Sequence, residues 1–311
     1  MQILVSGASG LVGSALVPSL ATAGHRVGRL VRAGTGGAAG AAPQSVATPG
    51  AIDVAWDPDA DRFDAARLEG FDAVVHLAGA SIAAGRWTAA RKEILRRSRV
   101  DATQGLSRAL AKMPRPPRAL VCASAVGFYG DRGDEVLTES SARGHGFLPA
   151  VCVAWESATE PAEKAGIRVV NLRFGVILSA RGGALAKMLL PFRLGLGGPV
   201  GSGRQYMPWI TLDDAVAAIE HALATATLEG AVNTVAPSTA TNLEFTRALG
   251  RVLGRPTIVP MPAPMARLAF GEMADALLLA SARVAPEALR ASGFRFRHPD
   301  LEPALRHVLG R

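Results

Sequence analysis

Residues 2–13, QILVSGASGLVG, place an apolar strand directly before three glycines spaced GxxGxxG. Gly7 is expected to turn the chain out of the strand, Gly10 to let the backbone approach a pyrophosphate, and Gly13 to let the next helix lie close to the sheet. The start of that helix offers unpaired N–H groups and a partial positive charge to phosphates. The pattern predicts a dinucleotide-binding turn, and a glycine turn without a ligand is the alternative.

Apolar strands and helical stretches alternate through the first 180 residues. The predicted strands are 2–6, 26–31, 52–56, 72–78, 118–123 and 168–174, and the predicted helices between them are 11–23, 89–112 and 153–165. Residues 33–50, mostly alanine, glycine and small polar residues, are predicted to form a loop. This alternation predicts an α/β fold, a Rossmann-type doubly wound parallel sheet with helices on both faces.

The sequence after residue 180 predicts a smaller and mostly helical lobe. Capping boxes are predicted at Thr211 with Asp214 and at Thr241 with Glu244. The expected helices are 185–194, 215–224, 245–253, 265–279 and 286–291, with a proline-rich linker at 255–264. We therefore expect a nucleotide-binding domain over 1–240, in which residues near 176–212 contribute to the substrate lobe, and a small C-terminal domain over 250–308.

The composition of the chain indicates in which cell compartment the protein works and which classes of protein it does not belong to. No uninterrupted apolar run reaches the roughly 18–20 residues that span a bilayer, and no basic segment of a signal peptide precedes the first strand. Cys122 and Cys152 lie in apolar surroundings without metal-ligand spacing, so neither a disulfide scaffold nor a metal site is expected. These features predict a cytoplasmic protein that does not insert in a membrane.

The net charge is +8, and six of the basic residues crowd one stretch, namely Arg86, Arg91, Lys92, Arg96, Arg97 and Arg99. Nucleic-acid binding is one reading, but aromatic residues make up only 5% of the chain and no nucleic-acid-binding motif is present. A basic helix face beside a phosphate-rich cofactor explains the same residues, so no nucleic-acid partner is expected.

The end of the second strand predicts which dinucleotide binds. An acidic residue there would hydrogen-bond the adenosine ribose of NAD, whereas an arginine accommodates the 2′-phosphate of NADP. The strand ends in Arg32 with no acid nearby. One charge-assisted hydrogen bond contributes about 1.5–3 kcal/mol, which predicts a roughly ten- to hundredfold preference for NADP(H). A solvated Arg32 without this role is the alternative.

The chain resembles the extended short-chain dehydrogenase/reductase superfamily, and more closely its atypical "epimerase family protein" branch. Matching motifs run along nearly the whole chain and include Gly7–Gly13, Val75-His-Leu-Ala-Gly79, Ser98-Arg99, Ser124-Ala-Val-Gly-Phe-Tyr-Gly130, Leu172-Arg-Phe-Gly175 and Pro208-Trp-Ile210. The stretch from about 250 to 308 looks like the small C-terminal domain that accompanies this branch. His76, inside the fourth strand, is expected to be a core residue.

The resemblance implies an NADP(H) site built from the glycine loop, the ends of two strands and one helix. Its expected residues are Gly7, Ser9, Gly10, Leu11, Val12, Gly13, Arg32, Leu77, Ala78, Gly79 and Arg99.

The catalytic set that the superfamily uses is altered in this chain. Active members carry a Tyr-xxx-Lys pair, in which the lysine lowers the tyrosine pKa, and the corresponding residues here are Cys152 and Glu156. Ala125 stands at the position of the helper hydroxyl, and Ser124 lies one place away, on the opposite face of the strand. The usual asparagine of the preceding helix corresponds to Arg99. A carboxylate near a thiol raises the thiol pKa, so Cys152 and Glu156 cannot replace the tyrosine and lysine.

Three other polar residues are candidates for chemistry. Ser124 could donate its hydroxyl, while Tyr129 and Glu156 could act as acid or base. Packing of Tyr129 and an arginine partner for Glu156 are the alternatives. The predicted function is an NADP(H)-dependent oxidoreductase or epimerase-like protein acting on an unidentified small molecule. The alternative is a non-catalytic NADP(H)-binding sensor or scaffold, and a homodimer is left open.

Overall fold

Seven parallel strands form the centre of the molecule. The computed structural model describes residues 1–32, 52–57, 62–63 and 65–311, so the loop expected at 33–50 lies outside the described residues. The sheet has the order β11 (Gly230–Thr234), β8 (Arg168–Phe174), β6 (Ala119–Ala125), β5 (Ala73–His76), β1 (Gln2–Ser6), β2 (Arg26–Arg32) and β3 (Ile52–Asp57), with the short antiparallel β4 (Arg62–Phe63) at its edge. The predicted doubly wound parallel sheet is confirmed.

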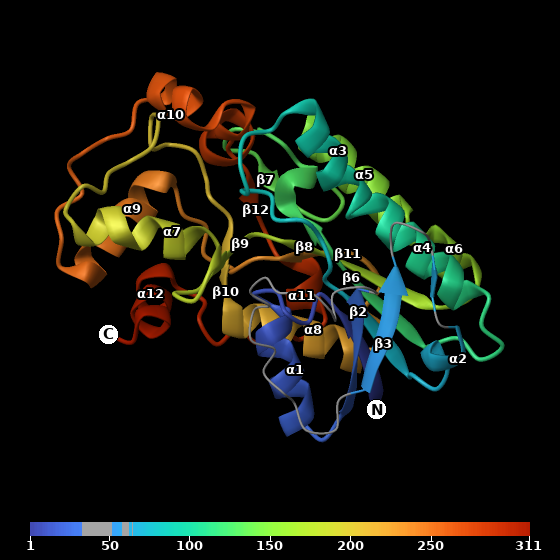
Figure 1. Ribbon diagram of the computed structural model, residues 1–311. Coiled ribbons are helices and arrows are strands. Elements are labelled where there is room, and N and C mark those ends of the chain that lie inside the picture. The colour runs from blue at the N-terminus through green and yellow to red at the C-terminus, as the bar shows by residue number, and fades with distance from the viewer. Residues whose placement is uncertain (33–51, 58–61, 64) are drawn as a thin grey trace, which may run out of the picture.

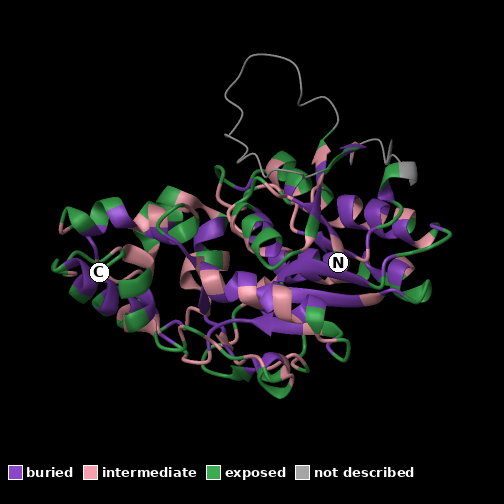
Figure 2. Ribbon diagram, turned by 90° about the horizontal axis from the view of Figure 1, so that it is seen from below, coloured by how far each residue is buried: buried purple, intermediate pink, exposed green. Residues whose placement is uncertain are grey.

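Helices cover both faces of this sheet (Figure 1). One face carries α1 (Gly13–Thr22), α8 (Leu212–Ala224) and α11 (Glu287–Ala291), and the other carries α2 (Ala65–Leu68), α4 (Val100–Ala111), α5 (Phe147–Ser157) and α6 (Glu160–Lys164), with α3 (Ala89–Arg97) against α4. Successive strand residues point to opposite faces, so both helical layers pack on apolar side chains. In β6, Val121 belongs to the first core and Leu120 to the second. Figure 2 shows these strands as the buried centre of the protein.

The strand order reverses between β1 and β5, and this reversal positions the site. The chain proceeds from β1 to β2 and β3 on one side, and from β5 to β6, β8 and β11 on the other. In open α/β sheets, ligands bind in the crevice that such a reversal creates at the carboxyl ends of the strands. The glycine loop follows β1 directly, so it lies at this crevice.

The second lobe lies at the left of Figure 1 and has its own apolar core. It contains α7 (Gly183–Arg193), α9 (Asn242–Leu253), α10 (Ala263–Phe270), a π-helix (Ala274–Leu279) and α12 (Leu301–Leu309), with the strand pair β9 (Val176–Leu178) and β10 (Trp209–Thr211). Its core joins Leu185, Trp209, Phe245 and Leu305, which are far apart in sequence. The second lobe therefore draws on both sides of residues 240–250, the boundary expected between the domains.

The C-terminal stretch also returns to the main sheet. Leu289 of α11 is buried in the core beneath β11, and β12 (Arg283–Val284) pairs with β7 (Val136–Leu137). Asp214 also holds the C-terminal stretch in place, because its buried carboxylate accepts hydrogen bonds from the N–H groups of Arg297 and His298 at 2.8 and 3.0 Å. The capping box expected at Thr211 is thus half formed: Thr211 caps α8, while Asp214 binds the C-terminal segment instead.

Several helix boundaries differ from the sequence prediction. The helix expected over 89–112 is divided into α3 and α4, and the one over 153–165 into α5 and α6. The complete capping box at Thr241 and Glu244 is confirmed. The prediction missed several elements, among them β11, which has only five residues, and α12, although Asp300 at its N-cap is a helix start signal. None of the helices in the described residues has the length and apolar character needed to cross a membrane.

Candidate cofactor site and catalytic corner

The glycine loop is so tight that two of its glycines admit no side chain. Gly7 has a φ of +67°, and a Cβ there would lie 2.7 Å from the carbonyl carbon of Leu77. A Cβ on Gly13 would lie 2.2 Å from the carbonyl oxygen of Gly7, far inside van der Waals contact. A Cβ on Gly10 would lie 3.2 Å from that same oxygen. The loop therefore needs glycine to bring α1 directly behind β1.

The N-terminus of α1 is built differently from those of α3, α8 and α9. Those three helices are capped by the side chains of Thr88, Thr211 and Thr241, whereas Val12, the N-cap residue of α1, makes no side-chain hydrogen bond. The first turn of α1 also holds no acidic residue. Helices α5, α7, α10 and α12 also lack a side-chain cap, so it is the glycine loop before α1 that makes this N-terminus suited to an anion. Ser9 and Leu11 lie in the same loop, between β1 and α1.

The turn after β5 packs against the glycine loop. The Ser6 hydroxyl accepts hydrogen bonds from the N–H groups of Leu77 and Ala78 at 3.1 and 3.3 Å, and it lies 2.6 Å from Nδ1 of His76. Burial lowers the pKa of His76 to about 4, so this histidine is neutral near pH 7. The prediction that His76 is a core residue is confirmed, since its side chain is fully buried. Ser6 was not predicted, although it is a polar residue at the end of a buried strand.

Arg99 connects this turn with the catalytic corner, the group formed by the candidate residues Ser124, Tyr129 and Glu156 together with Arg173. Its guanidinium donates to the carbonyl oxygens of Ala80 and Leu95 at 3.0 and 3.2 Å. A Cβ on Gly79 would lie 3.6 Å from Cζ of Arg99, which places the arginine against the turn. The same guanidinium lies 5.2 Å from the ring centre of Trp155 on α5. Arg99 therefore sits between the predicted cofactor loop and the helix that carries Cys152 and Glu156.

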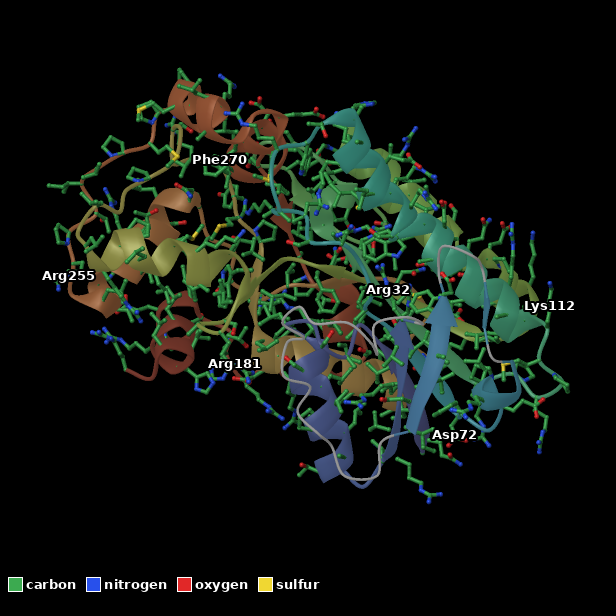
Figure 3. The ribbon with its side chains drawn as sticks, in the orientation of Figure 1. Arg32, Asp72, Lys112, Arg181, Arg255 and Phe270 are labelled. Atoms are coloured by element: carbon green, nitrogen blue, oxygen red, sulfur yellow. The ribbon has the colours of Figure 1, made fainter. Side chains whose placement is uncertain are left out.

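Arg32 is the last residue of β2, and its side chain is exposed. Figure 3 labels it near the middle of the molecule, whereas Asp72, just before β5, lies at the opposite end of the sheet. Arg32 is thus at the carboxyl edge, the same edge as the glycine loop and the turn after β5.

Polar side chains form a row across three neighbouring strands at this edge. Ser124 of β6 is in register with Arg173 of β8, and Arg173 is in register with Asn233 of β11. Residues in register point to the same face of a parallel sheet, so the three side chains are neighbours. All three are buried. Arg173 and Asn233 were missed in the sequence, although a charged residue in the apolar run VVNLRF signals a buried partner.

Glu156 closes this row from α5. Its carboxylate accepts two hydrogen bonds from Arg173, both at 2.8 Å, and one from the Ser124 hydroxyl at 2.6 Å. The side chains of Arg173 and Glu156 are only 5% and 14% exposed. Burial opposes the charge of Arg173, but Glu156 and Tyr129 raise its pKa on balance. The structure therefore gives Glu156 the arginine partner that the sequence left as an alternative, and the two charges neutralise each other.

Tyr129 is held in the interior by several hydrogen bonds. Its hydroxyl donates to Oδ1 of Asn233 at 2.7 Å and lies 2.9 Å from the carbonyl oxygen of Thr138, while Arg173 donates to it at 2.9 Å. The side chain is fully buried. Burial raises the pKa of the Tyr129 phenol above its usual range, despite the nearby Arg173. An activated tyrosine needs a lowered pKa, so the surroundings of Tyr129 favour a structural role.

Cys152 is the residue that the family resemblance places at the position of the usual tyrosine. It is 4% exposed and lies one helical turn before Glu156 on α5. Burial, together with the carboxylate of Glu156, raises the pKa of the thiol to about 12. The predicted increase in the pKa of the thiol is confirmed in direction, but burial contributes more to it than the carboxylate of Glu156 does. The thiol stays protonated near pH 7 and supplies no nucleophile or base.

The basic stretch that was interpreted as a face beside the cofactor is mostly bonded within the chain. Arg96 and Arg97 pair with Asp101, and Lys92 pairs with Glu272 near α10. Arg86 and Arg91 donate to backbone carbonyl oxygens. Arg99 packs against the turn after β5, and Arg91 donates to the carbonyl oxygen of Ser81 just beyond that turn.

Comparison with known proteins assigns the family. Residues 3–234 match the NAD dependent epimerase/dehydratase family, and residues 261–308 match a domain of unknown function, DUF1731. The chain belongs to the NAD-dependent epimerase/dehydratase family. This assignment confirms the resemblance to the "epimerase family protein" branch.

Relatives in this family match over the whole chain. The "Epimerase family protein Mb2239" of Mycobacterium bovis is 43% identical over 309 residues, covering 99% of this chain and 98% of the relative. The crystal structure of human epimerase family protein SDR39U1 with NADPH has a TM-score of 0.88 and 35% identity, with 100% of each chain covered. A nucleoside-diphosphate sugar epimerase from Corynebacterium glutamicum is 37% identical with a TM-score of 0.77, but this chain spans only 58% of it.

Proposed function

We propose that this member of the epimerase/dehydratase family binds NADPH. The single observation that carries the proposal is the glycine loop, whose Gly7 and Gly13 admit no side chain and whose helix starts without a side-chain cap. Its N–H groups would hold the pyrophosphate, and Arg32 would pair with the 2′-phosphate of the adenosine. The human relative solved with NADPH supports the choice of cofactor.

The proposed reaction is hydride exchange with a small molecule, in an oxidoreductase or epimerase-like manner. NADPH supplies the hydride when bound. Ser124 and Glu156 lie at the carboxyl edge, hydrogen-bonded to each other, and the side chain of Glu156 is 14% exposed. We assign Ser124 and Glu156 to positioning polar groups of the ligand, and Tyr129 to holding Arg173 and Asn233 in place.

A second candidate is a sensor or scaffold that binds NADPH without turnover. The observation that favours it is the closure of the polar network: Ser124, Arg173 and Tyr129 are all hydrogen-bonded within the chain. Cys152 and Tyr129 both have raised pKa values, so neither offers a proton-exchange group near pH 7.

The experiment is a calorimetric titration of NADPH and NADH into the protein and into Arg32→Ala. We expect a roughly ten- to hundredfold preference for NADPH that Arg32→Ala removes. Equal affinities in the unmodified protein would overturn the role of Arg32, and no response to either nucleotide would overturn cofactor binding. A screen of carbonyl compounds and nucleotide sugars, followed by reduced-nicotinamide absorbance, then separates the two candidates: turnover supports the oxidoreductase, and its absence with tight binding supports the sensor.

The absence of a nucleic-acid partner and the cytoplasmic location stay predictions, and the homodimer stays an open alternative.

A further inference from the structure

Three possible metal ligands meet where α12 lies beside α8. Asp213, His298 and His307 each offer one ligand atom, and these atoms all lie within 4.8 Å of one another. Nε2 of His307 is 2.6 Å from Oδ2 of Asp213, and the rings of His298 and His307 stack with their centroids 4.0 Å apart. Two imidazoles with one carboxylate form a ligand set suited to Zn²⁺ and similar transition metals.

The backbone that carries these ligands is fixed from several directions. Asp213 stands in the first turn of α8, which Thr211 caps. The N–H of His298 is bound by the buried carboxylate of Asp214. His307 lies in the last turn of α12, whose Leu305 is fully buried in the core of the second lobe. A site on such fixed elements needs little ordering when the metal binds.

We propose that Asp213, His298 and His307 bind one Zn²⁺ ion, with water as the fourth ligand, and that this ion links α12 to α8. In a tetrahedral zinc site with bonds of about 2.1 Å, ligand atoms lie about 3.4 Å apart. The 2.6 Å pair must therefore open by about 0.8 Å, and the other ligand atoms, all within 4.8 Å of one another, must adjust to the same spacing. Asp213 and His307 are 47% and 49% exposed, which leaves space for the water ligand.

The charges around the cluster favour imidazole-binding metals over Mg²⁺ and Ca²⁺. The site has a single carboxylate, whereas Mg²⁺ and Ca²⁺ prefer several oxygen ligands. Arg181 and Arg297 line a hollow of about 280 Å³ that also includes Asp213. Figure 3 labels Arg181 between α12 and α1. These positive charges weaken the binding of any cation that is held by electrostatic attraction alone. The preference for Zn²⁺ over Mg²⁺ and Ca²⁺ therefore has to come from coordination by the two imidazole nitrogens.

The experiment uses the full chain without a polyhistidine tag. We expect isothermal titration calorimetry with Zn²⁺ to give one ion per chain at micromolar affinity, and Co²⁺ to give visible absorption bands typical of a nitrogen- and oxygen-coordinated tetrahedral site. His298→Ala and His307→Ala should each weaken Zn²⁺ binding at least tenfold, and the double variant should remove it. His145→Ala changes an exposed histidine outside the cluster and should bind as the unmodified protein does.

Three results would overturn the proposal. The first is the absence of Zn²⁺ binding, which would leave only a histidine–aspartate pair. The second is Zn²⁺ binding by the double variant with the affinity of the unmodified protein. The third is binding of Mg²⁺ with the same affinity as Zn²⁺. Melting temperatures without metal confirm that each variant is folded, and Co²⁺ absorption of the unmodified protein tests the site even where a variant does not fold. NADPH titration is a separate measurement, so failure of the metal site is distinguishable from failure of the proposed cofactor site.

Discussion

The glycine loop and the catalytic corner lie at the same edge of the sheet but use their polar groups in opposite ways. At the loop, the N-terminus of α1 has no side-chain cap. At the corner, Ser124, Glu156, Arg173 and Tyr129 bond to one another. One region is therefore shaped by backbone geometry, with no side chain capping the start of its helix, while the other satisfies its polar side chains internally.

This difference teaches that cofactor binding and proton exchange are separable features of the fold. Backbone geometry supplies the cofactor loop, and it survives as long as the glycines remain. Proton exchange depends on side-chain identity, and the replacement of tyrosine and lysine by Cys152 and Glu156 leaves a carboxylate that needs a cation. Arg173 meets this need, because an unpaired buried charge is costly.

The largest effect is expected for Gly13→Ala, which tests the loop. The new Cβ would lie 2.2 Å from the carbonyl oxygen of Gly7 and force the loop away from α1. We expect NADPH binding to weaken at least thousandfold, or about 4 kcal/mol, in calorimetry. The matched control is Gly127→Ala beside the corner, where the nearest atom to the new Cβ would be 3.6 Å away. Equal losses in both variants would contradict the special role of the loop.

Next in size is the effect of Arg173→Met, which tests the corner. The substitution leaves the carboxylate of Glu156 buried without its cation. We expect urea unfolding to show a loss of about 3–5 kcal/mol in the free energy of unfolding. The double variant Arg173→Met/Glu156→Leu removes both charges and should recover most of this loss. A loss below about 1 kcal/mol in the single variant would show that the pair behaves as a surface salt bridge.

A smaller effect is expected for Tyr129→Phe. The variant removes a buried hydroxyl that bonds with Asn233 and Arg173, so we expect a loss of about 1–2 kcal/mol in the free energy of unfolding. NADPH affinity, and any turnover found, should change less than twofold. Tyr206→Phe is the control, because its hydroxyl makes none of the hydrogen bonds seen among the described residues. Loss of turnover at unchanged stability would instead make Tyr129 a catalytic residue.

The smallest effect concerns pH and Cys152. Its pKa is about 12 in the folded protein and about 8.5 in an unfolded chain. The unfolded state therefore loses its proton first, so this contribution to stability is complete below pH 8.5 and is lost as the pH rises towards 12. Between pH 7.5 and pH 9.5, we expect the unfolding free energy to fall by about 1 kcal/mol more in the unmodified protein than in Cys152→Ala. Equal slopes would show that the thiol is not shielded from solvent.

The sequence predicted the fold and the cofactor loop better than the corner. The period of the apolar residues and the spacing of Gly7, Gly10 and Gly13 are local signals, and both were read correctly. The predicted replacement of the tyrosine–lysine pair is implied by the family resemblance, and the two residues it concerns lie one turn apart within α5. The partner of Glu156 was left open, because Arg173 is 17 residues away in the sequence. The two side chains meet only when α5, which carries Glu156, packs against β8, which carries Arg173.

Distance along the sequence also explains which other features could be predicted and which could not. The sequence by itself determined the parallel sheet and the turn after β1, because each depends on residues close together in the chain. The replacement of the standard proton-transfer pair stays a prediction that the family resemblance implies. Only the tertiary structure decided which groups meet from distant segments: Arg173 with Glu156, Asp214 with His298, and Asp213 with His307. Such contacts depend on the order of strands in the sheet and on the return of the C-terminal stretch, which no local periodicity encodes.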